Sequence, residues 1–290
     1  EEVSIFGVSC IGSRGMSGTR PKEWLARQSQ GITLDRAIND MGGNLIRPGQ
    51  RDDIRAFLEL HIEQGPVLQD EHLDIGVVTA IAGITRIEIM VEGRADHAGT
   101  TPMGLRKDAL TTASWIALGV EELARALASG PEHFAATVGE FEMSPNAANV
   151  VPARVRLLID ARAESRADMD RFIDELRKGV AAIGDKTGVT ISEPRIVSDN
   201  PPTPLNADVL DVLDAACDSV GARHRRMASG AGHDTAWMSR ITKAAMIFVP
   251  CKDGRSHSAD EYATTDDIAL GAAVLLDAVK ALDGKLQERS

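Results

Sequence analysis

A change of hydrophobic pattern in the middle of the chain constrains the fold more than any other feature. Over residues 85–192, periods of two and of 3.6 residues alternate in the order strand, helix, strand, strand, helix, strand. The predicted strands are 85–92, 134–142, 153–161 and 188–192, and the predicted helices are 105–128 and 166–183. This order is typical of a four-stranded antiparallel sheet with two helices on one face. We therefore expect an inserted α+β domain over residues 83–197, followed by a stiff proline-rich linker at 200–204.

The sequence on either side of this insertion reads as two parts of one α/β domain, residues 1–82 and 198–290. Its predicted strands are 3–8, 57–63, 76–81 and 244–249, its predicted helices are 21–28, 33–41, 207–220, 234–239 and 265–283, and a glycine-rich turn is expected at 11–15. His61 falls near the carboxyl end of a predicted strand, which is where open α/β sheets place their functional sites.

Composition excludes several classes of partner. The formal net charge of −11 disfavours binding to nucleic acid or to an anionic membrane, and no apolar run approaches the ~20 residues of a membrane helix. The three cysteines are odd in number and widely spaced, which argues against a disulfide framework and indicates a reducing, cytoplasmic compartment. Because the chain opens on Glu1-Glu2 without an initiator Met or a signal peptide, we expect it to be an interior segment of a longer protein.

Several polar loops carry residues that could perform chemistry. His97 lies in a loop of small and polar residues, 93–103, which is either a capped turn or part of a site. Metal-type ligands occur at Glu1-Glu2, His61 and His257, and the combination of imidazole with carboxylate points to zinc, manganese or a similar divalent ion. Adjacent glutamates and loop histidines are more often solvated surface residues. The residues by themselves therefore leave both interpretations open.

Six short segments together resemble one enzyme family. In chain order they read HIEQGP at 61–66, GRADHAGTTPM at 93–103, NVVP at 149–152, IDAR at 159–162, SGAGHD at 229–234 and SHS at 256–258. This series closely resembles the N-carbamoyl-L-amino-acid hydrolase and allantoate amidohydrolase group of the dinuclear metallo-aminoacylase and carboxypeptidase superfamily. The resemblance implies an α/β fold, with a mixed sheet flanked by helices as a zinc-exopeptidase-like catalytic domain. The inserted four-stranded, two-helix domain would then be a dimerisation domain, and the protein a homodimer.

The resemblance also implies a role for each matching residue. Glu1 resembles the general base, and Glu2, His61 and His257 resemble ligands of two divalent metal ions, Zn, Mn or Co. His97 and Asn149 resemble residues that reach the substrate bound by the other subunit of the family dimer, where His97 polarises the carbonyl group. Arg162 resembles the arginine that holds the substrate carboxylate, although an ion pair with the neighbouring Asp160 is the ordinary alternative. The residues that resemble pocket lining are Gln64, Gly232 and His233.

These roles imply a metal-dependent amidohydrolase that cleaves the linear C–N bond of an N-carbamoyl-L-amino acid, with allantoate or another ureido acid as the alternative substrate. A ureido carbonyl is a poor electrophile, so its hydrolysis needs an activated water molecule. The family carries a His-x-Asp motif and a bridging Asp upstream of its Glu-Glu pair, and neither is present in this sequence. We therefore expect an incomplete metal site in this chain, and the competing hypothesis is a catalytically inactive chain with a degenerate site.

Overall fold

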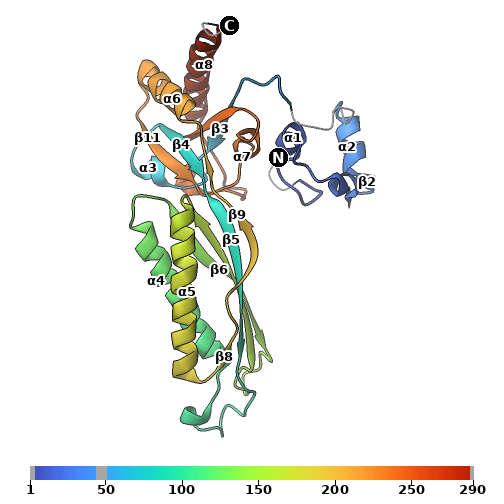
Figure 1. The fold of residues 1–290 in the computed structure, drawn as a ribbon, viewed down its shortest axis with the longest axis vertical. Coiled ribbons are helices and arrows are strands. Elements are labelled where there is room, and N and C mark those ends of the chain that lie inside the picture. The colour runs from blue at the N-terminus through green and yellow to red at the C-terminus, as the bar shows by residue number, and fades with distance from the viewer. Residues whose placement is uncertain (1–3, 44–50, 288–290) are drawn as a thin grey trace. The chain divides into compact units, whose positions relative to one another are not determined.

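The computed structural model describes residues 4–43 and 51–287. The chain divides into two compact units: the first consists of Glu1–Ile81 together with Thr203–Ser290, and the second is Ala82–Pro202. Figure 1 shows the elements of both. Across the described residues, no helix combines the length and the apolar character needed to cross a membrane.

The first unit is built on a five-stranded sheet. The strands are β3 (Ala56–Ile62), β4 (Ile75–Ile81), β10 (Thr203–Pro204), β11 (His224–Ser229) and β12 (Lys243–Val249). They lie in the order β10-β4-β12-β3, and β11 also pairs with β4. Because β12 runs parallel to β3 and antiparallel to β4, the sheet is mixed. The helices that follow or connect these strands are α3 (Val67–Asp70), α6 (Ala207–Val220), α7 (Thr235–Met238) and α8 (Thr265–Gln287), with a short 3₁₀ helix at Lys252–Gly254. The predicted α/β class with a mixed sheet is confirmed.

The core of this unit forms between the sheet and the helices α6 and α8. β12 is buried from Ala244 to Val249, as expected of a central strand. Helix α6 begins where the side chain of Asn206 accepts a hydrogen bond from the Val209 N–H, and it ends at Gly221, whose φ of 74° favours glycine. The buried stripe of α6 then packs on β4 and β12. The predicted helix 207–220 is confirmed, with Asn206 and Gly221 at its two boundaries.

The segment from Ser4 to Gly43 differs from its prediction. The expected strand at 3–8 is a turn in its described part, in which the Gly7 N–H donates to the Ser4 carbonyl. The expected turn at 11–15 lies within the helix α1 (Ile11–Met16), and the expected helix at 21–28 is a 3₁₀ helix at Lys22–Ala26. Two-residue strands β1 (Gln28–Ser29) and β2 (Ile32–Thr33) then precede helix α2 (Leu34–Asp40). The predicted strand was wrong because a short apolar run without a strand partner has no ladder to join. The predicted helix at 33–41 is confirmed as α2.

The second unit is an antiparallel sheet with two long helices. Its strands are β5 (Gly83–Glu92), β6 (Phe134–Ser144), β7 (Arg154–Ala163), β8 (Thr190–Ile191) and β9 (Arg195–Asn200), and its helices are α4 (Ala109–Ala128) and α5 (Arg166–Thr187). The order is β6-β7-β5-β8, and β9 also pairs with β5. The sheet therefore has five strands where the sequence predicted four. Most of the linker expected at 200–204 is in strands. β9 ends at Asn200 and pairs with β5, and β10 covers 203–204 and pairs with β4.

The two helices pack on one face of this sheet, as Figure 1 shows. β7 alternates between buried apolar residues and partly exposed polar ones, and its buried residues meet α4 and α5. Phe134 and Phe172 lie at the centre, with ring centroids 5.2 Å apart. Helix α4 begins at Ala109, later than predicted, because the side chain of Asp108 caps it by accepting from the Thr111 N–H at 3.0 Å. The opposite face of β5 and β7 carries mostly charged side chains.

Candidate active site

The residues predicted for the site fall into three groups. One group lies in each unit, and the third lies outside the described residues. Glu1 and Glu2 form that third group. In the first unit, His61, Gln64, Gly232, His233 and His257 lie on β3 or in the loops that follow β3, β11 and β12.

His61 is held at the end of β3 with one ring nitrogen available. Its Nδ1 atom lies 2.8 Å from the carbonyl oxygen of Ile62. A carbonyl oxygen only accepts, so Nδ1 carries the proton and Nε2 keeps its lone pair. This is the tautomer in which a histidine binds a metal ion through Nε2. The side chain therefore fits the ligand role that the sequence predicted, although no metal is needed to explain its orientation.

His233 is buried beneath His61. Its side chain is only 1% exposed, and its Nε2 lies 2.7 Å from the hydroxyl oxygen of Ser229. Burial, together with the nearby ring of His61, lowers the pKa of His233 to about 3, so the ring is neutral at physiological pH. The two imidazole rings meet edge to face with centroids 4.7 Å apart. His233 therefore packs against the His61 ring from the buried side. The prediction that His233 lines an open pocket stays a prediction.

Glu59 ties the loop that contains His233 to the sheet. Its carboxylate accepts hydrogen bonds from both the backbone N–H of Thr235, at 2.8 Å, and the Thr235 hydroxyl. The other carboxylate oxygen lies 4.0 Å from Nδ1 of His233. Sequence reasoning did not single out Glu59, Ser229 or Thr235. The signal was the alternation of β3, which places Glu59 and His61 on the same face of the strand.

The loops after β3 and after β12 meet through a chain of hydrogen bonds. The side-chain amide of Gln64 donates to the Ser256 hydroxyl at 2.7 Å, and that hydroxyl donates to Glu261 at 3.0 Å. The same carboxylate oxygen accepts from the backbone N–H of His257, at 3.0 Å. These hydrogen bonds hold the pKa of Glu261 below its ordinary value. Glu261, which the sequence analysis missed, therefore organises the loop that presents the exposed His257.

A second carboxylate near His61 has a structural role. Glu63 accepts from the backbone N–H groups of Val67 and Leu68, both at 2.8 Å, and so caps the short helix α3. Burial raises the pKa of this carboxyl group. With both oxygens used in capping, Glu63 has no part in the candidate site.

In the second unit, His97 and Asn149 lie in adjacent loops. The His97 Nδ1 atom accepts from the backbone N–H groups of Gly99 and Thr100, at 3.0 and 3.2 Å. In the neutral ring the proton is therefore on Nε2, and the side chain is exposed. The Ala98 N–H donates to the Asn149 carbonyl at 3.0 Å, and His97 forms an isolated bridge with Val150. The loops thus present a fixed N–H donor beside an exposed amide side chain.

Arg162 lies on β7, on the sheet face that the helices leave uncovered. Its Nε atom donates to Asp160 at 2.8 Å, and Arg86 donates to the other oxygen of the same carboxylate at 3.3 Å. The ion pair considered as the ordinary alternative is therefore present. The Arg162 side chain is about one-third exposed, at 36%. The carboxylate-binding role of Arg162 stays a prediction.

The metal ligands do not assemble from the described residues alone. Within residues 4–43 and 51–287, no group of three or more His, Cys, Asp or Glu side chains is arranged to hold a metal ion. A catalytic zinc normally has three protein ligands, and His61 supplies one suitable nitrogen. The described residues therefore do not fit a complete dinuclear site, and Glu2, His61 and His257 remain predicted ligands.

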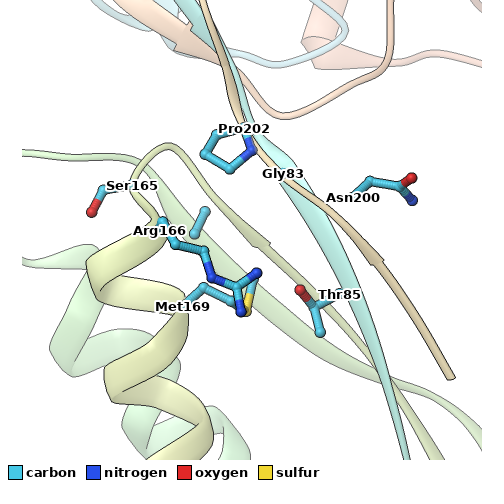
Figure 2. Close-up of a pocket in the computed structure, with 8 residues that line it drawn as sticks. Gly83, Thr85, Ser165, Arg166, Met169, Asn200 and Pro202 are labelled. Carbon is cyan, nitrogen blue, oxygen red and sulfur yellow. The ribbon is translucent and has the colours of Figure 1, made fainter. Parts of the chain in front are cut away.

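Figure 2 shows a shallow pocket of the second unit between β5, the start of α5 and the end of β9. Arg166 points into it and is paired with Asp199, which also accepts from Thr85 at 2.7 Å. A Cβ atom at Gly83 would lie 2.6 Å from the Pro202 nitrogen, so only glycine allows the two chain segments to approach. None of the predicted site residues lines this pocket, and its polar side chains Thr85 and Arg166 are both bound to Asp199.

Comparison with known proteins identifies the family. Residues 1–281 match the family model described as peptidase family M20/M25/M40. The chain belongs to this family. It is 34% identical to the N-carbamoyl-L-amino-acid amidohydrolase of Paenarthrobacter aurescens, covering 98% of this chain and 69% of that protein. It is 36% identical to the ureidoglycolate hydrolase of Oryza sativa subsp. japonica, covering 97% of this chain and 60% of that protein.

Solved structures agree with this assignment. An amidase of the hydantoinase/carbamoylase family from Burkholderia multivorans superposes with a TM-score of 0.87 at 35% identity, covering 96% of this chain and 67% of that one. AtUAH in complex with glyoxylate superposes with a TM-score of 0.72 at 35% identity, over 97% of this chain and 69% of that one. The predicted resemblance to hydantoinase/carbamoylase amidohydrolases, a group of hydrolases, is confirmed. The chain spans 60–69% of the length of these relatives.

Proposed function

We propose that the protein carrying this chain is an amidohydrolase that cleaves the linear C–N bond of an N-carbamoyl-L-amino acid. The observation that supports this most directly is the fixed tautomer of His97. With Nδ1 accepting from Gly99 and Thr100, the exposed Nε2–H is a donor of set direction. A donor held in place before the reaction is what stabilises the negative charge that develops on a carbonyl oxygen during hydrolysis.

The other exposed polar groups suit the remaining parts of such a substrate. Asn149 offers an amide next to the His97 donor, suited to the ureido group. The guanidinium of Arg162 is planar and two-pronged, which suits a carboxylate, and its bond to Asp160 orients it. Gln64, Gly232 and His233 are proposed to line the pocket, and Glu1 is proposed as the general base.

The family implies a pair of divalent metal ions, which would activate water when bound. We propose Glu2, His61 and His257 as ligands, on the support of the available Nε2 of His61. Because the described residues do not complete such a site, the chemistry we assign to this chain is confined to proton transfer by Glu1, substrate binding and carbonyl polarisation by its own side chains.

We further propose that the first unit is the catalytic domain and that the second is an inserted domain through which a homodimer forms. β6 lies at the edge of its sheet, and Phe141 and Met143 on it are 40% and 36% exposed. An unpaired edge with exposed apolar side chains can be covered by pairing with a second copy. Light scattering tests this: a monomer with full hydrolytic activity would contradict the proposed role of His97 across the dimer.

A second candidate substrate class is a ureido acid such as ureidoglycolate or allantoate. It is favoured by 36% and 37% identity to the ureidoglycolate hydrolases of Oryza sativa subsp. japonica and Arabidopsis thaliana. A relative named allantoate amidohydrolase, from Bacillus subtilis, is 33% identical. The carboxylate and ureido contacts proposed above are common to all three substrates, so the two candidates differ only in what lies between those groups.

A substrate panel tests both candidates. The natural protein, supplied with Mn²⁺ or Zn²⁺, is given an N-carbamoyl-L-amino acid, allantoate or ureidoglycolate, and ammonia release is followed together with the free amino acid or glyoxylate. We expect hydrolysis of the carbamoyl amino acid. Preferential hydrolysis of a ureido acid would favour the second candidate over N-carbamoyl-L-amino-acid hydrolysis. If none of the three substrates released ammonia, the proposed function would be refuted.

A further inference from the structure

A hydrogen bond between residues far apart in the sequence joins α1 to the start of α7. The hydroxyl of Ser13, in α1, donates to the carboxylate of Asp234, the residue immediately before α7. Ser13 is only 2% exposed. A hydroxyl has one proton, and a carboxylate is a stronger acceptor than the Cys10 carbonyl, which lies 3.2 Å from the same oxygen. The Ser13 hydroxyl is therefore committed to Asp234.

The position of Asp234 gives this bond its importance. Asp234 directly follows Gly232 and His233, two of the residues that we propose to line the substrate pocket. An aspartate at the start of a helix ordinarily accepts from an N–H group of that helix's own first turn. Asp234 makes no such bond, because its backbone is already in the helical region. Its carboxylate is used to reach α1 instead.

Two further contacts hold α7 in place. On the sheet side, Glu59 of β3 accepts from both the N–H and the hydroxyl of Thr235. On the α1 side, the guanidinium of Arg14 stacks on the ring of Trp237, with its Cζ atom 3.5 Å from the ring centroid. The chain that follows His233 is therefore held by the sheet from one element and by α1 from another.

α1 is in turn fixed to the beginning of the described chain. The segment between Ser4 and α1 contributes to a small apolar cluster, whose buried members are Phe6, Val8, Ile11 and Leu34. The Ser4 hydroxyl also donates to the Val8 carbonyl at 2.7 Å. Ser4 follows the proposed base Glu1 closely in the sequence. The bond from Ser13 to Asp234 therefore joins the segment that leads from the proposed base to the loop that carries the proposed pocket residues.

We propose that Ser13 is a positioning residue for hydrolysis, because its bond to Asp234 sets the proposed base and the proposed substrate pocket in one geometry. This inference rests on the proposed function, and Ser13 is not among the residues assigned to the reaction above. A misplacement of about 1 Å caused by a substitution far from the chemistry can cost roughly 10²-fold in rate. Loss of this single bond should therefore be visible in turnover by protein that is still fully folded.

Three variants of the natural protein test the role of the hydroxyl. Each is measured on the best substrate of the panel, well below its own unfolding midpoint, so that a loss of stability alone leaves kcat/KM unchanged. Ser13→Ala should lower kcat/KM by about 10-fold or more, and Ser13→Thr, which keeps a hydroxyl, should recover most of that loss. Ser17→Ala is the matched control. Ser17 is also buried, but its hydroxyl bonds within its own segment, to Thr19 at 2.8 Å, so this variant should stay within about twofold of the parent.

A double-mutant cycle assigns the effect to the bond itself. Asp234→Ala is measured alone and together with Ser13→Ala. If the two side chains act through one another, the double variant should be no slower than the slower single variant. Amide hydrogen exchange over residues 233–238 gives a readout that does not depend on hydrolysis. Exchange should be roughly 10-fold faster in Ser13→Ala, the worth of a charge-assisted hydrogen bond, and unchanged in Ser17→Ala.

Three results would overturn the proposal. The first is a kcat/KM in Ser13→Ala within about twofold of the parent, and the second is a fully additive loss in the double variant. The third is unchanged hydrogen exchange over residues 233–238 in Ser13→Ala. A parent that hydrolyses no substrate of the panel would refute the proposed function, whereas an active parent with an equally active Ser13→Ala variant would refute only the positioning role.

Discussion

Two substitutions at His97 separate the roles of its ring nitrogens. In His97→Asn, the amide oxygen lies near the former position of Nδ1 and can accept from Gly99 and Thr100, but nothing replaces the Nε2–H donor. In His97→Gln, an amide group reaches the position of Nε2, and the acceptor for the two backbone N–H groups is lost. The first variant therefore keeps the loop and removes the donor, and the second does the opposite.

The magnitudes follow from the hydrogen bonds. Nδ1 accepts two bonds, at 3.0 and 3.2 Å, on an exposed ring. At about 0.5–1.5 kcal/mol each, with exposure favouring the lower end, His97→Gln should lower the free energy of unfolding by about 1–2 kcal/mol. His97→Asn should leave it nearly unchanged. Loss of a donor to a developing oxyanion costs about 2.7–4 kcal/mol, so His97→Asn should reduce kcat by roughly 10²- to 10³-fold.

Urea denaturation and steady-state ammonia release measure the two effects on the same preparations. We expect stability and activity to change in opposite order in the two variants, with His97→Asn stable but slow. Should His97→Asn keep kcat within about threefold of the parent on the best substrate of the panel, the donor role of His97 and the argument from its tautomer would be wrong.

Further predictions concern binding, packing and pH. Arg162→Lys should raise KM by about tenfold or more, because an ammonium cannot reproduce a two-pronged contact, and unchanged kinetics would leave Arg162 with only its ion pair. Phe172→Ala should lower the free energy of unfolding by about 3–5 kcal/mol, since this ring is fully buried; a loss below 1 kcal/mol in denaturant titration would contradict the packing described for α5. A hydrogen bond from Arg223 holds the pKa of Asp74 below its ordinary value, so this pair stabilises the fold above pH ~4 and the contribution is lost as the pH falls through the lower folded pKa. Arg223→Gln should therefore flatten the acid limb of a stability–pH curve, and an unchanged limb would show that the pair contributes nothing.

Local pattern determined much of this fold. The alternation of β5 and β7 and the apolar stripes of α4 and α5 identified the sheet and helices of the second unit before any contact was known, because each buries one face only. Asn206 and Gly221 marked the ends of α6 because capping depends on residues a few positions away. The position of His61 at a strand end followed from the same local alternation.

Elements that depend on a distant partner were not predictable in this way. β11 carries His224, Arg225 and Arg226, a run without an apolar alternation, and it is a strand because it pairs in parallel with β4. β9 is likewise a strand through its pairing with β5. In both cases the hydrogen-bonding partner, about a hundred or more residues away, outweighs the local preference.

The same division holds for the site. Sequence motifs identified His61, His97 and His257, since a residue type is visible in a sequence. Only the tertiary structure decided which atoms of these residues are available. The Ile62 carbonyl sets the tautomer of His61, and Glu261 holds the backbone of His257. The bond from Gln64 to Ser256 joins residues 192 positions apart, and the ring of His233 is neutral because the folded chain buries it. Hydrogen bonding and desolvation depend on what surrounds a group in space, and the order of residues alone does not contain that information.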